Sequence, residues 1–234
     1  MINHLKSLSG KIRRKYYALA YRGENVICEM CDWRGKFFFR GRCPNCNSLP
    51  RTRLIPFSIK YFNLEEEMGN ILHVAPNLSE YRYVSRNVKF SIYDRLDIVK
   101  RDIINLQQDL TKMKIEDEQY NLSILWHVLE HIPNDLEAIS ELYRVMKKGG
   151  KVLVSVPIFP VGNKETYEDK NLPRAKYLEV HGHEDHCRSC GLDYFKRFES
   201  VGFKTYILNG SELSTEAIRK FGLSTSHVVW LFEK

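Results

Sequence analysis

Four cysteines combine a side-chain type and a spacing that are typical of metal binding. They follow the pattern C-x2-C-x11-C-x2-C and comprise Cys28, Cys31, Cys43 and Cys46. Two knuckles of this kind, at the ends of a short hairpin, bring four thiolates around one zinc ion. Thiolates then fill all four positions and leave none for a reactive water molecule, so the pattern predicts a structural zinc ribbon. Metal binding would supply roughly 10–16 kcal/mol of folding free energy to this small unit.

A second group lies near the middle of the chain. His127, Glu130 and His131 form H-x-x-E-H, which as a string is the inverted zinc-peptidase motif. Peptidase chemistry needs both histidines on one face of a helix, with the glutamate as base. Pro133 follows two residues later and would interrupt such a helix, so we set the peptidase aside.

A third group falls in an irregular stretch after Pro157. Imidazole and thiolate both suit zinc, so a second metal site is one interpretation of this segment. The other interpretation is a lid over a bound ligand, because long connections with little periodicity inside a compact domain are usually functional. The residues concerned are His181, His183, His186, Cys187 and Cys190.

Hydrophobic patterning indicates the elements that position His127, Glu130 and His131. Residues 122–126 form a short apolar run that suits a strand buried on both faces. A helix that Asp135 can cap should follow, and residues 152–156 read as another buried strand. Strand, helix and strand form a right-handed crossover, and ligands bind beyond the carboxyl ends of strands in such sheets. The three residues should therefore lie at a ligand-binding edge.

The same stretch carries a family resemblance. The segment WHVLEHIPND, followed by ELYRVMKKGGKVLVSVP, resembles the "HVLEHI...LRVLKPGG" segment of class I S-adenosylmethionine-dependent methyltransferases. It is most similar to a branch with a Cys-rich N-terminal ribbon, a TYED segment and a later DH...G-x-DY segment. The matching residues are Tyr167, Glu168, Asp169, Asp185, His186, Gly191, Asp193 and Tyr194.

The resemblance covers most of residues 25–208 and implies an α/β fold. We expect a doubly wound, Rossmann-like, seven-stranded methyltransferase sheet preceded by the zinc ribbon. Residues 204–208 and 227–232 resemble the closing strands of that fold. The branch has apolar or aromatic residues where Cys187 and Cys190 stand, which favours the lid over a second metal site.

The resemblance also implies which residues bind S-adenosylmethionine. The first strand, residues 70–75, leads into the turn HVAPNLSEY, which lacks the family's usual glycines. The second strand, residues 89–93, ends at Asp94, where a carboxylate can accept both ribose hydroxyls; Asp97 is a near rival. Asp102 matches the position whose side chain and neighbouring backbone read the adenine amino group. The predicted cofactor residues are His73, Val74, Ala75, Pro76, Asp94, Arg95, Asp102, Ile103, Trp126 and His127.

His127 and His131 are the predicted catalytic residues, because imidazole can take a proton from an acceptor hydroxyl or amine. Methyl transfer from a sulfonium is a displacement in which positioning does most of the work, so a base is not obligatory. Related enzymes are often found among genes for cell-surface sugars. We therefore expect methylation of an oxygen or nitrogen atom of a glycan or a small sugar-like metabolite.

Two other functions are consistent with the sequence. The first is an RNA methyltransferase whose basic ribbon contacts phosphates. The second is a non-catalytic binding module with a degenerate methyltransferase fold, which the glycine-free first turn keeps open. Retained Asp94 and the intact HVLEH segment argue against this module.

Charge and composition bound the remaining choices. Residues 1–60 hold 13 lysines and arginines against three acidic residues, or +10, so the remainder contributes −3 to the net charge of +7. This asymmetry indicates a nucleic-acid, phosphate or membrane-surface partner, or simply a solvated ribbon. No apolar run approaches the roughly 18 residues of a membrane span, and charges stand where a signal peptide would be apolar, so we expect a cytoplasmic protein. The oligomeric state stays open.

Three segments follow from these patterns. Leu5, Leu8, Ile12, Tyr16 and Leu19 recur at helical spacing and predict an amphipathic basic helix at the N-terminus. We expect this helix in residues 1–24, the four-cysteine zinc ribbon in residues 25–50 and the methyltransferase domain in residues 51–234.

Overall fold

The computed structural model describes residues 12–66 and 69–234. Residues 12–20 are helical, as predicted from Ile12, Tyr16 and Leu19, whereas Leu5 and Leu8 lie outside the described residues. Among the residues that the structure describes, no helix is long and apolar enough to cross a membrane.

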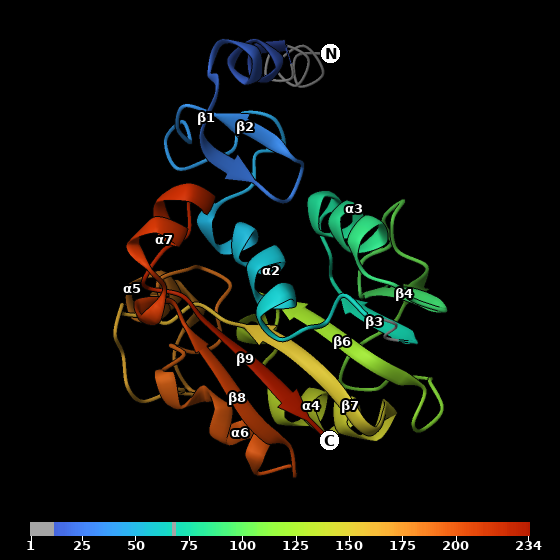
Figure 1. Cartoon of the computed structure of the whole chain (residues 1–234). Coiled ribbons are helices and arrows are strands. Elements are labelled where there is room, and N and C mark those ends of the chain that lie inside the picture. The colour runs from blue at the N-terminus through green and yellow to red at the C-terminus, as the bar shows by residue number, and fades with distance from the viewer. Residues whose placement is uncertain (1–11, 67–68) are drawn as a thin grey trace, which may run out of the picture.

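A seven-stranded sheet is the centre of the fold (Figure 1). Its strand order is β5-β4-β3-β6-β7-β9-β8. Neighbours from β5 to β7 are parallel, while β9 runs antiparallel between β7 and β8. The expected doubly wound, seven-stranded sheet is therefore present. The strands are β3 (Asn70–Val74), β4 (Ile92–Asp97), β5 (Leu106–Gln107), β6 (Tyr120–Trp126), β7 (Met146–Ser155), β8 (Lys204–Asn209) and β9 (Val228–Glu233).

Helices cover both faces of the sheet (Figure 1). One face packs against α2 (Pro50–Tyr61) and α3 (Leu78–Asn87), and the other packs against α4 (Asp135–Val145) and α6 (Phe195–Glu199). The remaining helices are α5 (Tyr177–His181) and α7 (Thr215–Phe221), with 3-10 turns η1 (Leu129–His131), η2 (Arg174–Lys176), η3 (Leu192–Tyr194) and η4 (Gly210–Glu212).

Alternation along the strands divides the buried side chains between two cores. In β3, Ile71 belongs to the core under α2 and α3, whereas Leu72 and Val74 belong to the core under α4 and α6. The same alternation recurs in β7 and β9 because successive side chains of a strand point to opposite faces. Both faces are buried, which explains the nearly continuous apolar runs in the sequence.

The N-terminal ribbon is built on a short hairpin. Strand β1 (Arg22–Cys28) pairs antiparallel with β2 (Trp33–Gly35), so the first cysteine knuckle forms the turn between them. Strand β1 spans position 24/25, at which the sequence predicts a segment boundary. Ribbon residues Val26, Met30 and Trp33 join the same core as α2 and α3.

Arg53 of α2 ties the ribbon to the rest of the molecule. Its guanidinium, although buried, donates to the carbonyls of Gly41 and Ser48 in the ribbon. It also donates to the carbonyls of Phe221 and Gly222 at the end of α7. One buried cation thus satisfies carbonyl groups from two segments that meet on α2.

Two predictions about local elements are wrong. The second strand of the sheet does not end before Asp94; β4 runs on to Asp97. The carboxylate of Asp135 does not cap α4 either, because Asp135 is the first residue of the helix and pairs with Arg188 and Arg197. The end of β4 and the start of α4 are both decided by contacts with residues distant in the sequence. A local sequence pattern carries no information about such contacts.

Candidate active site

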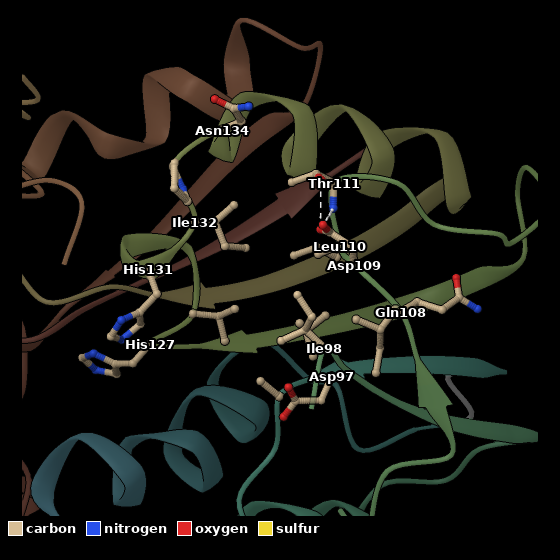
Figure 2. A pocket seen from close by; sticks show the side chains of 15 residues that line it. Asp97, Ile98, Gln108, Asp109, Leu110, Thr111, His127, His131, Ile132 and Asn134 are labelled. Atoms are coloured by element: carbon tan, nitrogen blue, oxygen red, sulfur yellow. Dashed lines mark hydrogen bonds between the residues drawn. The ribbon is translucent and has the colours of Figure 1, made fainter. Parts of the chain in front are cut away.

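A pocket of about 470 Å³ opens where β3, β4 and β6 end (Figure 2). This is the carboxyl edge of the parallel strands, where ligands bind in open α/β sheets, and its volume suits a small-molecule ligand. It is lined by Val74, Ala75, Leu96, Asp97, Ile98, Gln108, Asp109, Leu110, Thr111, His127, Val128, His131, Ile132, Pro133 and Asn134.

Two residues of the pocket wall have left-handed backbone conformations. Ala75, directly after β3, has φ 48°, and His127, directly after β6, has φ 56°. Hydrogen bonds hold both turns: the Ala75 amide donates to the Leu96 carbonyl, and the His127 amide donates to the Ser155 carbonyl. Such conformations cost about 1–3 kcal/mol in a non-glycine residue and cluster at functional sites.

The acidic residue at the end of β4 is Asp97, the rival of Asp94 for the predicted ribose-binding position. The Asp94 carboxylate accepts from Asn105 and from the hydroxyl of Tyr120, which begins β6 at the opposite end from His127. It does not line the pocket, whereas Asp97 does. Asp97 accepts from the Val99 amide and pairs with Arg101, so its carboxylate is held at the pocket wall.

The next acidic side chain of the pocket is Asp109, which sequence reasoning missed. Predicted Asp102 and Ile103 lie in a turn before β5 and do not line the pocket. Asp109 follows β5 and accepts from the amide and hydroxyl of Thr111, and these hydrogen bonds lower the pKa of its carboxyl. The D-x-T spacing of this turn was the available signal.

Four other predicted cofactor residues lie outside the pocket wall: His73, Pro76, Arg95 and Trp126. His73 and Trp126 point to the sheet face that α2 covers. The buried His73 ring bonds to the Tyr93 hydroxyl, and the Trp126 indole donates to the Arg51 carbonyl. Strand alternation is the reason, since their neighbours Val74 and His127 are the residues that reach the pocket.

Both predicted catalytic histidines line the pocket, and Figure 2 shows their rings on the same side of it. Between them in the chain, Glu130 is 1% exposed. One Glu130 oxygen lies 3.3 Å from His127 Nδ1 and 3.9 Å from His131 Nε2. Burial by itself raises the pKa of the Glu130 carboxyl, but the adjacent His127 and His131 outweigh burial and hold the pKa below its ordinary value.

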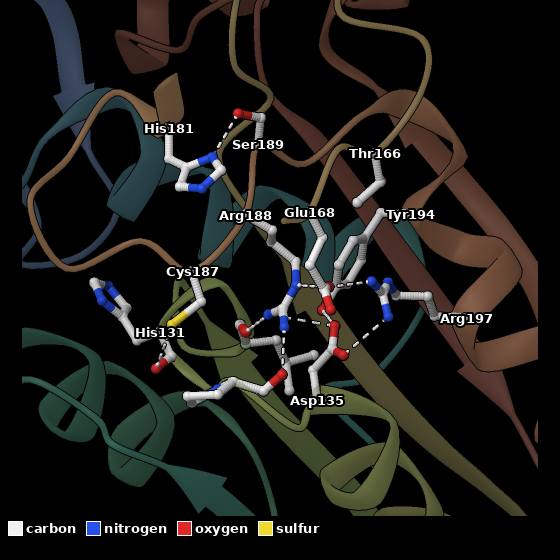
Figure 3. A network of polar contacts seen from close by, with 12 residues as sticks. His131, Asp135, Thr166, Glu168, His181, Cys187, Arg188, Ser189, Tyr194 and Arg197 are labelled. Atoms are coloured by element: carbon white, nitrogen blue, oxygen red, sulfur yellow. Dashed lines mark hydrogen bonds and ion pairs between the residues drawn. The ribbon is translucent and has the colours of Figure 1, made fainter. Parts of the chain in front are cut away.

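A long connection between β7 and α6, residues 156–191, docks on the turn from β6 to α4. Its anchor is the buried guanidinium of Arg188 (Figure 3). Arg188 donates to the carbonyls of Leu129 at 2.6 Å and Pro133 at 2.9 Å, and to the Glu168 carboxylate at 2.9 Å. Its Nη1 also lies 3.4 Å from Asp135.

The two sequence segments of the branch therefore meet in one ion-pair network. Glu168, from the TYED segment, also pairs with Arg197. Tyr194, from the later segment, donates to Asp135 at 2.6 Å. Asp193, also from the later segment, accepts from the amide and hydroxyl of Thr166. These residues hold the 156–191 segment in place.

The five histidines and cysteines of the third sequence group do not gather into one cluster. Cys190 is buried in the core under α4 and α6. Cys187 contacts the His131 carbonyl, and His181 bonds to Ser189. Of the five, only His186 has a ligand atom that lies within 4.8 Å of ligand atoms of both Glu130 and His131.

The four ribbon cysteines do gather. Their sulfur atoms all lie within 4.8 Å of one another, with Cys28 and Cys46 at 3.6 Å and Cys31 and Cys43 at 3.7 Å. A zinc–sulfur bond of about 2.3 Å gives a tetrahedron with edges of about 3.8 Å. The geometry and the soft donor set fit zinc, and none of the four is in a disulfide.

Comparisons with known proteins agree with this fold. Residues 70–154 match the family model Methyltransf_11, described as a methyltransferase domain. No curated protein matches the chain.

Several solved structures are similar. An S-adenosylmethionine-dependent methyltransferase from Mesorhizobium loti has a TM-score of 0.54 and 10% identity, and the match covers 76% of this chain and 96% of that one. One from Archaeoglobus fulgidus has a TM-score of 0.53 and 14% identity over 80% of this chain and 95% of that one. One from Aquifex aeolicus has a TM-score of 0.50 and 16% identity over 76% and 87%. At sequence identities this low, the structural similarity establishes a shared fold and nothing further.

The strand order, with an antiparallel strand inserted before the last edge and a pocket at the carboxyl ends of β3 and β4, defines the class I methyltransferase fold. The family match over residues 70–154 and this shared fold together support an S-adenosylmethionine-dependent methyltransferase, and therefore an enzyme.

Replacing Arg188 tests the anchor of the 156–191 segment. Arg188→Met leaves the buried Asp135 and the partly buried Glu168 short of a partner, so unfolding free energy should fall by about 3–5 kcal/mol. Arg174→Met removes an exposed ion pair of the same segment and should cost about 1 kcal/mol or less. Urea unfolding of both variants measures the difference. Equal losses would contradict the assigned role of Arg188.

Proposed function

We propose that this enzyme transfers the methyl group of S-adenosylmethionine to an oxygen or nitrogen atom of a glycan or a small sugar-like metabolite. The observation that carries the proposal is the pocket itself. Asp97 and Asp109 line it after β4 and β5, while His127 and His131 line it after β6. When bound, S-adenosylmethionine supplies the methyl group on a positively charged sulfur.

The acidic side of the pocket suits an adenosine. Asp97, at the end of β4, would accept hydrogen bonds from the two ribose hydroxyls, because a carboxylate offers two acceptor oxygens. Asp109 would accept from the adenine amino group, and the apolar side chains of Leu96, Ile98 and Leu110 would cover the base. The turn at Ala75 would bring main-chain atoms close to the rest of the cofactor.

The histidine side of the pocket suits a hydroxyl-bearing acceptor. His127, His131 and Asn134 offer imidazole and amide groups that exchange hydrogen bonds with hydroxyls. In the transfer, the sulfur–carbon bond breaks as the acceptor oxygen or nitrogen bonds to carbon. The acceptor proton then passes to a ring nitrogen of His127, whose Nε2 has no hydrogen-bond partner among the described residues.

Cofactor binding by Asp97 can be tested against the sequence-based assignment to Asp94. At a hundred dissociation constants, S-adenosylmethionine should stabilise the wild type by about 2.7 kcal/mol. Asp97→Asn removes a charged acceptor worth about 1.5–3 kcal/mol and should weaken cofactor binding by roughly 10- to 100-fold. Asp94→Asn should keep the ligand-induced shift, whatever its effect on the unliganded protein.

Thermal unfolding with and without the cofactor measures both variants. Loss of the shift in Asp94→Asn with retention in Asp97→Asn would reverse the assignment. If S-adenosylmethionine causes no shift in the melting temperature of the well-folded wild type, the proposed function is refuted.

RNA is the second candidate acceptor, and one surface favours it. A groove of about 1070 Å³ runs between the ribbon and the N-terminal end of α3. Among the described residues, five cations and no carboxylate line it: Arg14, Lys15, Arg51, Arg82 and Arg86. The groove also reaches Asn77, in the turn that follows Ala75 of the active-site pocket. A polyanion could therefore pass from the groove to the pocket.

Salt dependence separates the two acceptor classes. If RNA is the acceptor, binding of a labelled single-stranded RNA should weaken steeply with salt, with a logarithmic slope of about −0.7 per phosphate contact. The double variant Arg51→Glu and Arg82→Glu should then reduce both the affinity and the slope. Arg34→Glu, an exposed ribbon residue outside the groove, is the matched control. If the double variant binds the RNA as the wild type does, RNA is not the acceptor, and the glycan or sugar-like metabolite remains the proposed one.

We also infer that the cluster of four ribbon cysteines binds a structural zinc ion. We further propose that the chain is organised as an N-terminal helix, a zinc ribbon and a methyltransferase domain. Support comes from the sulfur geometry and from Arg53, which links the ribbon to α2 and α7. Cys43→Ser should reduce the zinc content by one ion per chain and lower the melting temperature. Cys187→Ser should retain the ribbon zinc. Equal zinc in both variants, measured by elemental analysis, would contradict the site.

A further inference from the structure

Three side chains with metal-ligating groups converge beside the active-site pocket. One oxygen of Glu130 and one ring nitrogen each of His131 and His186 lie within 4.8 Å of one another. Glu130 and His131 belong to the turn after β6, and His186 belongs to the docked 156–191 segment. His131 also lines the pocket, so the cluster borders the place where the acceptor must enter.

The carboxylate of Glu130 is buried without a hydrogen-bond partner. It is 1% exposed, and neither of its oxygens has a partner among the described residues. The nearest groups are ring nitrogens of His127 and His131, at 3.3 Å and 3.9 Å. A buried carboxylate in this state is costly unless a positive charge lies against it. The adjacent imidazoles can supply that charge only as protonated rings, and a bound cation would supply it in their place.

The two histidine rings are oriented for coordination by their other nitrogens. His131 Nδ1 lies 3.1 Å from the Asp185 carbonyl, and His186 Nδ1 lies 3.3 Å from the His181 carbonyl. A carbonyl only accepts, so each Nδ1 carries the proton and each Nε2 keeps its lone pair. Metal-binding histidines are held in this way, with the second nitrogen donating to a backbone carbonyl or carboxylate.

A zinc-peptidase site does not fit this cluster. The H-x-x-E-H string does not form an α-helix; residues 129–131 form only a 3-10 turn. Glu130, which is the base in a peptidase, is here one of the converging groups, and the second histidine ring comes from His186, 55 positions along the chain from His131. The site is thus assembled by docking of the 156–191 segment.

We propose that Glu130, His131 and His186 bind a divalent cation that holds the acceptor next to the methyl donor. Two imidazoles and one carboxylate suit Mn²⁺, Fe²⁺, Co²⁺ or Zn²⁺ better than Mg²⁺ or Ca²⁺, which prefer oxygen ligands alone. Three protein ligands leave coordination positions for an oxygen of the acceptor. The cation site stands on the geometry, whereas its role toward the acceptor rests on the proposed methyl transfer.

Direct metal binding tests the site. Protein whose ribbon holds zinc is titrated with Mn²⁺, which thiolates bind poorly, and free Mn²⁺ is followed by electron paramagnetic resonance. The wild type should bind one Mn²⁺ per chain. Glu130→Gln and His186→Ala should each bind it at least tenfold more weakly. His183→Asn, which replaces an imidazole stacked on His186 outside the cluster, should bind it as the wild type does.

Two results would overturn the proposal: a wild type that takes up neither Mn²⁺ nor Zn²⁺ beyond the ribbon ion, or equal affinity in Glu130→Gln and the wild type. If Glu130→Gln does not fold, His131→Ala and His186→Ala decide in its place, since neither ring is fully buried. The cofactor-induced thermal shift is measured on the same samples. A wild type that binds no metal beyond the ribbon ion but keeps the cofactor-induced shift refutes the cation site alone, while an absent shift in the wild type refutes the proposed function.

Discussion

The buried guanidinium of Arg188 is the interaction on which docking of the 156–191 segment depends. It joins the carbonyls of Leu129 and Pro133, on the turn after β6, to the carboxylate of Glu168 in the 156–191 segment. A guanidinium can do this because its five donors are fixed in one plane and always charged. Because Arg188 is fixed in this way, His186, which lies two residues earlier in the chain, is held beside Glu130.

The turn after β6 therefore serves both halves of the active site. His127 and His131 line the pocket, while Glu130 and the carbonyl of Leu129 face the docked segment. The two halves depend on each other, because the turn of residues 127–134 contributes one wall of the pocket and also receives the docked segment. Sheet geometry positions the residues that we propose for the cofactor, and an ion-pair network positions those that we propose for the acceptor.

The fold could be predicted from the sequence because its signals are local and strong. The apolar run before His127 and the helical spacing after Asp135 are enough to define the crossover, and the cysteine spacing is enough to bring four sulfurs together. The individual residues of the site were harder to predict from the sequence than the fold was. Asp94 and Asp97 differ only by where β4 ends, which depends on pairing with β3 and β5. The approach of His186 to Glu130 depends on contacts between segments more than 50 positions apart, which no local pattern contains.

The glycine-free turn after β3 illustrates why conformation is a better guide than composition. A glycine-rich turn is useful because glycine adopts positive φ without a steric penalty. Here Ala75 adopts φ 48° and keeps that conformation through its hydrogen bond to the Leu96 carbonyl. His127 does the same at the end of β6. The two left-handed residues both line the pocket, so the backbone shape that admits a ligand is retained at a cost of a few kcal/mol. The missing glycines therefore give no reason to doubt a cofactor site at this edge of the sheet.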